Sequence, residues 1–143
     1  MVRHAQAAIS AYKHFETSTY TDKRLILLKL FSALLDSVNK AAKAILAKNY
    51  EEKGKNIARA IMILGELNAA LDRGQENELI TNLEALYFYA IEELCWANLK
   101  NDLSRLKNVE RILKPLAEAW QEAVQKERQE SNTEKTNQNE KNK

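Results

Sequence analysis

The chain has 143 residues, of which 45% are hydrophobic and 29% are charged, a composition that fits one globular domain with its own core. Three glycines and one proline are too few for the turns of an all-β or α/β fold, so we expect an all-α protein. With 22 basic and 20 acidic residues the formal net charge is +2, which excludes a strong electrostatic attraction to nucleic acid or to an anionic membrane.

The N-terminal sequence MVRHAQAAIS lacks the long apolar run of a signal peptide. The longest apolar run, Leu25–Leu35, is interrupted by Lys29 and Ser32 and is too short to cross a bilayer. The single cysteine, Cys95, fits a reducing compartment and is expected to be a structural residue rather than a catalytic thiol. We therefore expect a cytoplasmic protein without membrane insertion.

The first predicted helix spans Val2–Thr17 and carries few apolar residues, so it should dock weakly on the rest of the chain. A segment rich in hydroxyl and β-branched residues then interrupts the helical pattern. Asp22 is a suitable N-cap for the next helix, because its carboxylate can accept hydrogen bonds from unpaired first-turn amides.

The central helix is expected over Leu25–Leu46, and the other helices should pack around it. Its main apolar stripe runs from Leu27 to Ile45 at the i, i+3/i+4, i+7 spacing of one buried helical face. A second stripe lies to one side of the first and consists of Leu25, Leu28, Leu35 and Ala42/Leu46. Such a helix should contact neighbours on two sides. If the chain covers the second stripe only in part, the stripe is a candidate binding surface.

Two more helices are predicted over Tyr50–Leu71 and from about Asn77 to Lys100, each with an apolar stripe of helical period. Asn49 should cap the first of them, with Glu52 completing a capping box. At the end of the second, Asn101 should adopt the left-handed conformation, and Asp102 should cap the following helix.

The last predicted helix carries a stripe from Leu103 to Val124, with a kink expected at Pro115. From Glu127 onward no residue is apolar, so burial cannot offset the entropy of ordering and we expect disorder. The predicted architecture is an antiparallel four-helix bundle with a short extra N-terminal helix over residues 1–126, followed by a disordered polar tail over 127–143.

No pattern of catalytic or metal-binding residues occurs. Both histidines, His4 and His14, lie in the weak first helix, and no HExxH, CxxC, P-loop or GxGxxG motif is present. The adjacent Glu92 and Glu93 are expected to be solvated charges. We therefore expect a protein that is not an enzyme and has no cofactor or metal. What remains is a helical module that binds another protein or associates with itself.

Four segments, taken together and in order, resemble the FliS family of flagellin export chaperones. The resemblance covers about Ile9 to Val124. Its segments are Ala11-Tyr12; Arg59-Ala60-x-x-Ile63-x-x-Glu66-Leu67-x-x-Ala70-Leu71-Asp72; Asn82-Leu83-x-x-Leu86-Tyr87-x-Tyr89; and Ala97-Asn98-Leu99-Lys100-Asn101-Asp102 with Glu118-Ala119-Trp120.

The chain departs from the family pattern at four places, which bear on partner contacts rather than on the fold. The family's Thr-Ala-Ser-Pro before the central helix is Tyr20-Thr21-Asp22-Lys23 here, so the cap is kept and the proline is lost. The other departures are Ser32-Ala33 for Asp-Gly, Glu76-Asn77 for Gly-Gly, and Glu92-Glu93 for paired arginines.

The resemblance implies an antiparallel bundle that binds the disordered C-terminal segment of flagellin, prevents its premature polymerisation and assists its delivery to the type III export apparatus. Its implied partners are flagellin and components of the export gate. The first helix, through Ile9 and Tyr12, would cover part of the binding groove until the client displaces it. Candidate flagellin-binding residues are Ile9, Tyr12, Leu25, Leu28, Leu35, Ile57, Ile61, Leu64, Asn82, Tyr87 and Asn98.

Two alternatives stay open at this level. The side chains of Asn82 and Asn98 are equally suited to binding a partner's backbone and to packing within the bundle. The chain as a whole, expected to be a monomer or a weak homodimer, is also consistent with a self-associating adaptor that has no peptide client.

Overall fold

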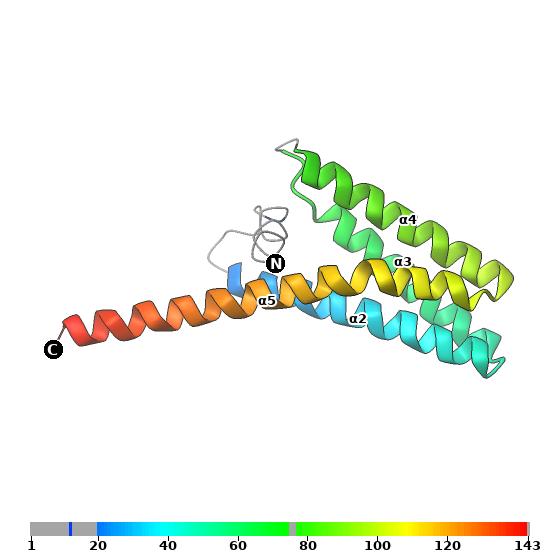
Figure 1. Cartoon of the computed structure of the whole chain (residues 1–143), viewed down its shortest axis with the longest axis horizontal. Helices are drawn as coiled ribbons and strands as arrows, with labels where there is room; N and C mark the ends of the chain where they lie inside the picture. The colour runs from blue at the N-terminus through cyan, green and yellow to red at the C-terminus, as the bar shows by residue number, and fades with distance from the viewer. Residues whose placement is uncertain (1–11, 13–19, 75–76, 143) are drawn as a thin grey trace.

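In the computed structural model, the described residues are Tyr12, 20–74 and 77–142. They form four helices, α2 (Tyr20–Leu46), α3 (Tyr50–Ala69), α4 (Glu78–Lys100) and α5 (Leu103–Lys141) (Figure 1). No described residue lies in a strand, which confirms the all-α class. The helix expected over Val2–Thr17, with Ile9, lies outside the described residues except for Tyr12.

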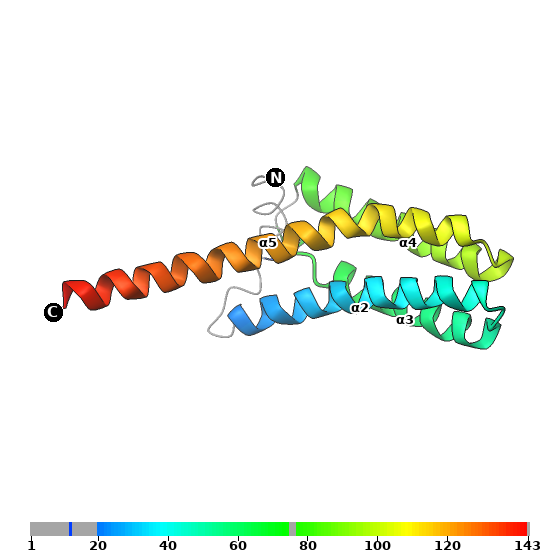
Figure 2. The same cartoon turned by 60° about the horizontal axis from the view of Figure 1, so that its bottom comes forward.

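Each helix packs against two others. Both α2 and α4 contact α3 and α5, so α2 and α4 lie diagonally across the bundle. The α2–α3 and α4–α5 turns lie at the same end of the molecule (Figures 1 and 2). From that end α4 and α5 diverge, and α5 continues well beyond the other helices.

The core is built from one apolar face of each helix, as the sequence predicts. Burial of each large side chain stabilises the fold by about 1.5–3 kcal/mol. The largest fully buried side chains are Leu27, Phe31 and Leu34 from α2, Ile57, Leu64 and Leu67 from α3, Tyr87 and Leu94 from α4, and Leu106, Val109, Leu113 and Trp120 from α5.

The turn between α2 and α3 is a Schellman motif. Lys48 has a left-handed φ of 57°, its amide donates to the Ile45 carbonyl, and the amide of Asn49 donates to the Ala44 carbonyl. Asn49 also caps α3, because its side chain accepts from the Glu52 amide. The expected capping box is not formed, since the Asn49 amide that Glu52 would need is already bonded to Ala44.

The start of α2 was wrongly predicted. The helix begins at Tyr20, so Asp22 lies inside its first turn rather than at the N-cap. A proline at the first helical position would favour a fixed start there. This chain has Lys23 instead, which places no such restriction on the preceding residues.

The caps predicted at Asn101 and Asp102 are confirmed, whereas the N-cap at Asn77 was not predicted. Asn77 caps α4 through the Ile80 amide at 2.9 Å, so α4 itself begins one residue later, at Glu78. Asn101 ends α4 in the left-handed conformation with φ 52°. Asp102 caps α5 by accepting from the Ser104 amide at 3.0 Å.

The C-terminal segment differs from expectation, because α5 runs without a break through Pro115 and on to Lys141. Every side chain from Arg128 to Asn142 is exposed. No apolar burial therefore orders this segment. Glutamate, lysine, glutamine and arginine are good helix formers, and a helix already nucleated by packing extends at little further cost. The division into a domain at 1–126 and a separate tail remains a prediction.

Candidate protein-binding site

Tyr12 lies between α3, α4 and α5, where it is only 3% exposed. Its hydroxyl donates to the Leu67 carbonyl at 3.1 Å and lies 2.9 Å from the Tyr87 hydroxyl. Its ring makes an edge-to-face contact with Trp120, with 5.6 Å between centroids. A side chain from outside the four helices thus completes their core. We call this position the Tyr12 slot.

The Tyr12 hydroxyl satisfies a backbone group that the end of α3 leaves without a helical partner. The Leu71 amide, which would bond Leu67 if the helix continued, instead donates to Asn68. Leu67 therefore accepts from Tyr12. Because the single hydroxyl proton of Tyr12 is used in this way, the Tyr87 hydroxyl donates to Tyr12.

Burial changes the acidity of both tyrosines. Desolvation raises the pKa of Tyr87 to about 12, although its hydrogen bond with Tyr12 partly opposes the shift. The pKa of Tyr12 is raised well above its usual value, first by desolvation and then by the neighbouring Tyr87. Both side chains are therefore neutral at any physiological pH, and the slot is an uncharged aromatic site.

The second apolar stripe of α2 is incompletely covered. Leu25, Leu28 and Leu35 pack against the core but remain half-buried, and so does Ile61 on α3. These four side chains are accessible without any rearrangement of the bundle. They are the apolar contact residues among the predicted ones that a partner can reach directly.

Three other candidates belong to the core rather than to a surface. Ile57, Leu64 and Tyr87 are almost completely buried, so a partner reaches them only if a neighbouring element moves. Helical period showed that these residues lie on an apolar face, but it could not distinguish the face that meets the bundle from one left open. Tyr87 differs from Ile57 and Leu64, because one of the groups that cover it is Tyr12, which lies outside the four helices.

The two asparagines on α4 point to solvent. Asn82 and Asn98 are both exposed, and neither side chain hydrogen-bonds another residue in the described part of the chain. Packing within the bundle therefore does not account for them. Their amide groups are available to the backbone of a partner, which favours that alternative.

Arg24, Lys53 and Glu93 are buried charged residues that were not predicted from the sequence, and the last two join helices through hydrogen bonds. The Lys53 ammonium donates to the Asn98 carbonyl at 2.9 Å and to the side chain of Asn101, which ties α3 to the α4–α5 turn. Glu93, expected to be solvated, is 5% exposed and bridges to α5 through Arg105 at 2.8 Å and Asn108 at 3.2 Å. Only Glu92 of that pair is exposed.

The site offers shape and apolar surface rather than reactive groups. Across the described ranges, no cluster of three or more metal-ligating side chains is found. Nor does any helix in those ranges have the length and apolar character needed to cross a membrane.

Comparison with known proteins gives one consistent result. The family described as "Flagellar protein FliS" matches residues 5–127. The flagellar secretion chaperone FliS of Bacillus subtilis is 35% identical over 123 residues, 86% of this chain and 90% of the relative. FliSB of Pseudomonas aeruginosa is 36% identical over 120 residues, 84% and 91% of the two chains. FliS of Escherichia coli is 34% identical over 100 residues, 69% and 74%.

Proposed function

This chain belongs to the FliS family of flagellar secretion chaperones, and from that premise we propose that its client is the C-terminal segment of flagellin. The family is one of chaperones rather than enzymes. In this proposal the chain holds the segment in the cytoplasm, prevents its premature polymerisation and assists its delivery to the flagellar type III export apparatus, where components of the export gate are further partners. Its scaffold would be an antiparallel four-helix bundle with a short N-terminal helix, working as a monomer or a weak homodimer.

The half-buried stripe of α2 supports this proposal. A disordered segment that orders on binding loses about 2–5 kcal/mol or more to conformational entropy, so it needs a long apolar contact. Leu25, Leu28 and Leu35 extend along α2, and Ile61 adds a contact from α3. A client helix lying along these residues would bury its own apolar face against them.

The Tyr12 slot is the observation that carries the proposal. Tyr12 is joined to its surroundings by two hydroxyl contacts and one ring contact. An apolar side chain of the client could replace it against Tyr87 and Trp120 once the N-terminal segment moves away. Tyr12 would then act as a lid, and the client would bind in competition with it.

Calorimetric titration with the cognate flagellin C-terminal peptide tests both parts of this proposal. We expect a 1:1 complex in which the peptide gains helix. Removing the lid should make client binding roughly tenfold tighter in Tyr12→Ala, because the energy of displacing the side chain is no longer needed. Tyr12→Phe keeps the ring and should show a smaller effect. Leu28→Glu should abolish binding, with circular dichroism to confirm that the variant is folded.

The possible results separate the two ideas. If no heat and no complex are observed with the wild-type chain, flagellin is not the client. If the peptide binds the wild-type chain and binds Tyr12→Ala with the same affinity, flagellin is the client but Tyr12 does not act as a lid.

A further inference from the structure

The outer face of α4 carries large apolar side chains that the core does not bury, although Arg105 of α5 lies over the ring of one of them, Trp96. Phe88, Tyr89, Trp96 and Leu99 are between 41% and 69% exposed. At about 1.5 Å per residue, Phe88 to Leu99 spans roughly 16 Å, or three helical turns. Their side chains lie on one side of the helix, opposite the face that packs into the core. We call these four residues the α4 patch. A grouping of this kind on a small protein marks an interaction site more often than chance exposure.

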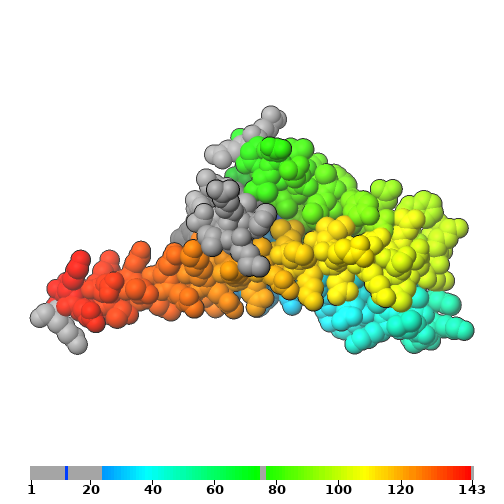
Figure 3. Space-filling model, viewed as in Figure 1, coloured from blue at the N-terminus to red at the C-terminus, as the bar shows by residue number. Residues whose placement is uncertain are grey.

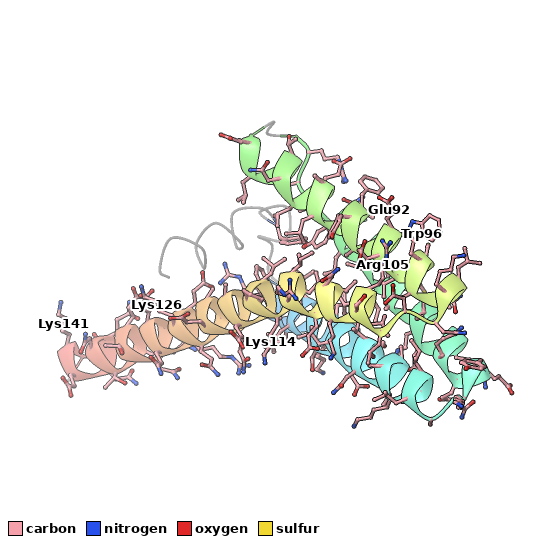
Figure 4. All side chains as sticks on the ribbon, turned by 45° about the vertical axis from the view of Figure 1, so that its right-hand side comes forward. Glu92, Trp96, Arg105, Lys114, Lys126 and Lys141 are labelled. Carbon is pink, nitrogen blue, oxygen red and sulfur yellow. The ribbon has the colours of Figure 1, made fainter. Side chains whose placement is uncertain are left out.

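The α4 patch has one charged group at its centre. Glu92 lies one turn from Phe88 and one turn from Trp96, is exposed, and forms no ion pair with any residue in 24–74 or 77–142. Arg105 of α5 pairs with Glu93 and Asp102 and lies over the Trp96 ring at 5.7 Å. Figure 4 shows Glu92 and Trp96 on α4, with Arg105 of α5 on the side where the two helices meet. No ion pair among the described residues therefore neutralises the Glu92 carboxylate.

The α4 patch does not include the half-buried α2 stripe of the proposed client surface, although the client candidates Asn82 and Asn98 lie on the same helix as the patch. The α2 stripe lies on the helix diagonally opposite α4. The space-filling view shows α4 forming its own flank of the molecule, away from α2 (Figure 3). One partner on α2 therefore leaves the α4 patch free for another.

We propose that the α4 patch binds an amphipathic helix of a second protein, one that carries a lysine or arginine flanked by large apolar residues. The apolar residues of this helix would cover Phe88, Trp96 and Leu99, and its cation would pair with Glu92. A second copy of this chain fits less well, because a two-fold contact centred on the patch would bring two Glu92 carboxylates together as the apolar groups exclude water. This inference does not depend on the identity of the client.

The test uses two fluorescently labelled synthetic helical peptides of about four turns, identical except for the residue at the centre of their apolar face. One peptide has lysine there and the other glutamate. Anisotropy should show binding of the lysine peptide, with the glutamate peptide at least roughly tenfold weaker. Glu92→Lys should reverse this preference. Trp96 emission should shift to shorter wavelength when the peptide covers it.

Surface variants provide the controls. Phe88→Ser and Trp96→Ser replace exposed side chains, so they should fold normally and lose binding of both peptides. Met62→Ser removes an exposed apolar side chain from α3 and should leave binding unchanged. Binding of neither peptide, or equal binding of both, would overturn the proposal. So would competition by the flagellin segment, or a dimer of this chain that Phe88→Ser dissociates.

Discussion

At the scale of single residues, the hydroxyl groups of Tyr12 and Tyr87 determine how the fold responds to high pH. Below about pH 10 both groups are protonated in the folded and the unfolded chain. Above it the unfolded chain releases these protons, whereas the folded chain keeps that of Tyr87 until its pKa of about 12. The unfolded state thus binds fewer protons. The free energy of unfolding should fall by about 1.4 kcal/mol per pH unit for each tyrosine that keeps its proton.

Urea denaturation at several values between pH 9 and about pH 12 measures this effect. Lysines and other tyrosines also titrate in this range, so the comparison is with the double variant Tyr12→Phe/Tyr87→Phe. That variant should be less stable at pH 9, because it lacks the hydroxyl contacts, and its stability should decline less steeply. Two parallel stability curves would show that the pair does not retain its protons in the folded state.

Lys53 is a second single residue on which the packing of two helices depends. Its buried ammonium binds the Asn98 carbonyl and the side chain of Asn101. In Lys53→Met the apolar stem is kept while both acceptors lose a donor, so we expect a loss of about 1–3 kcal/mol in the free energy of unfolding. The matched control is Lys55→Met, whose exposed ammonium has a long 3.9 Å contact with Glu51 and should change stability by less than about 0.5 kcal/mol. If chemical denaturation shows the same loss of stability in both variants, the packing of the two helices does not depend on Lys53.

At the scale of secondary-structure elements, the turn between α2 and α3 contains a strained backbone position that a glycine would relieve. Lys48 occupies the left-handed position of the Schellman motif, where a side chain costs about 1–2 kcal/mol and glycine does not. Glycine also raises the entropy of the unfolded chain, which opposes part of the gain. We therefore expect Lys48→Gly to raise the free energy of unfolding by about 0.5–1 kcal/mol, measured by thermal or urea denaturation.

A control for Lys48→Gly lies nearby. Lys55 is an exposed lysine with ordinary helical backbone in α3. Lys55→Gly should therefore destabilise the chain by about 1 kcal/mol, since glycine is unfavourable within a helix. A loss of stability in both variants would mean that the Lys48 side chain contributes more than its backbone strain costs.

The elements that could be predicted are those fixed by neighbouring residues. Asn49, Asn101 and Asp102 act as the caps expected of them, because a cap depends on a short side chain and the amides one turn away. The prediction that Asp22 caps α2 was wrong, because the sequence has no residue such as a proline that would fix where α2 starts. The helix from Glu127 to Lys141 was missed because its stability comes from the preceding, packed part of α5 and not from its own sequence.

The candidate site was predicted only in part, since exposure depends on the neighbours of each face. The half-buried stripe of α2 could be proposed because the helix has more apolar surface than one contact requires. Helical periodicity alone could not show whether Ile57 and Leu64 are buried or exposed. The α4 patch was missed for a related reason: Phe88 and Trp96 resemble core residues in a sequence, and only the packing of α3 and α5 shows that α4 turns them to solvent.

At the scale of the whole molecule, the diagonal placement of α2 and α4 separates two kinds of apolar surface. On the α2 side, half-buried leucines adjoin a core completed by a residue from outside the four helices. On the α4 side, fully projecting aromatic residues surround a carboxylate. One bundle can therefore present different surfaces to different partners at the same time, with α3 and α5 as the shared support.

The extension of α5 beyond the bundle leads to the last prediction. Val124 is buried in the core and Glu127 pairs with Arg24, whereas the side chains from Arg128 onward are exposed. A chain that ends at Arg128 should therefore lose helical signal in circular dichroism while its free energy of unfolding changes by less than about 0.5 kcal/mol. A synthetic peptide of residues 128–143 should not be helical alone, because it is rich in asparagine, serine and threonine, which are poor helix formers, and it is hardly longer than the length of about 12–15 residues below which even favourable isolated helices are marginal. Amide exchange in the full chain should likewise be slow up to about Glu127 and fast beyond it, as expected for a helix that frays from a packed base. A clear loss of stability on truncation would contradict this account, since it would mean that the extension packs against the bundle and is part of the domain.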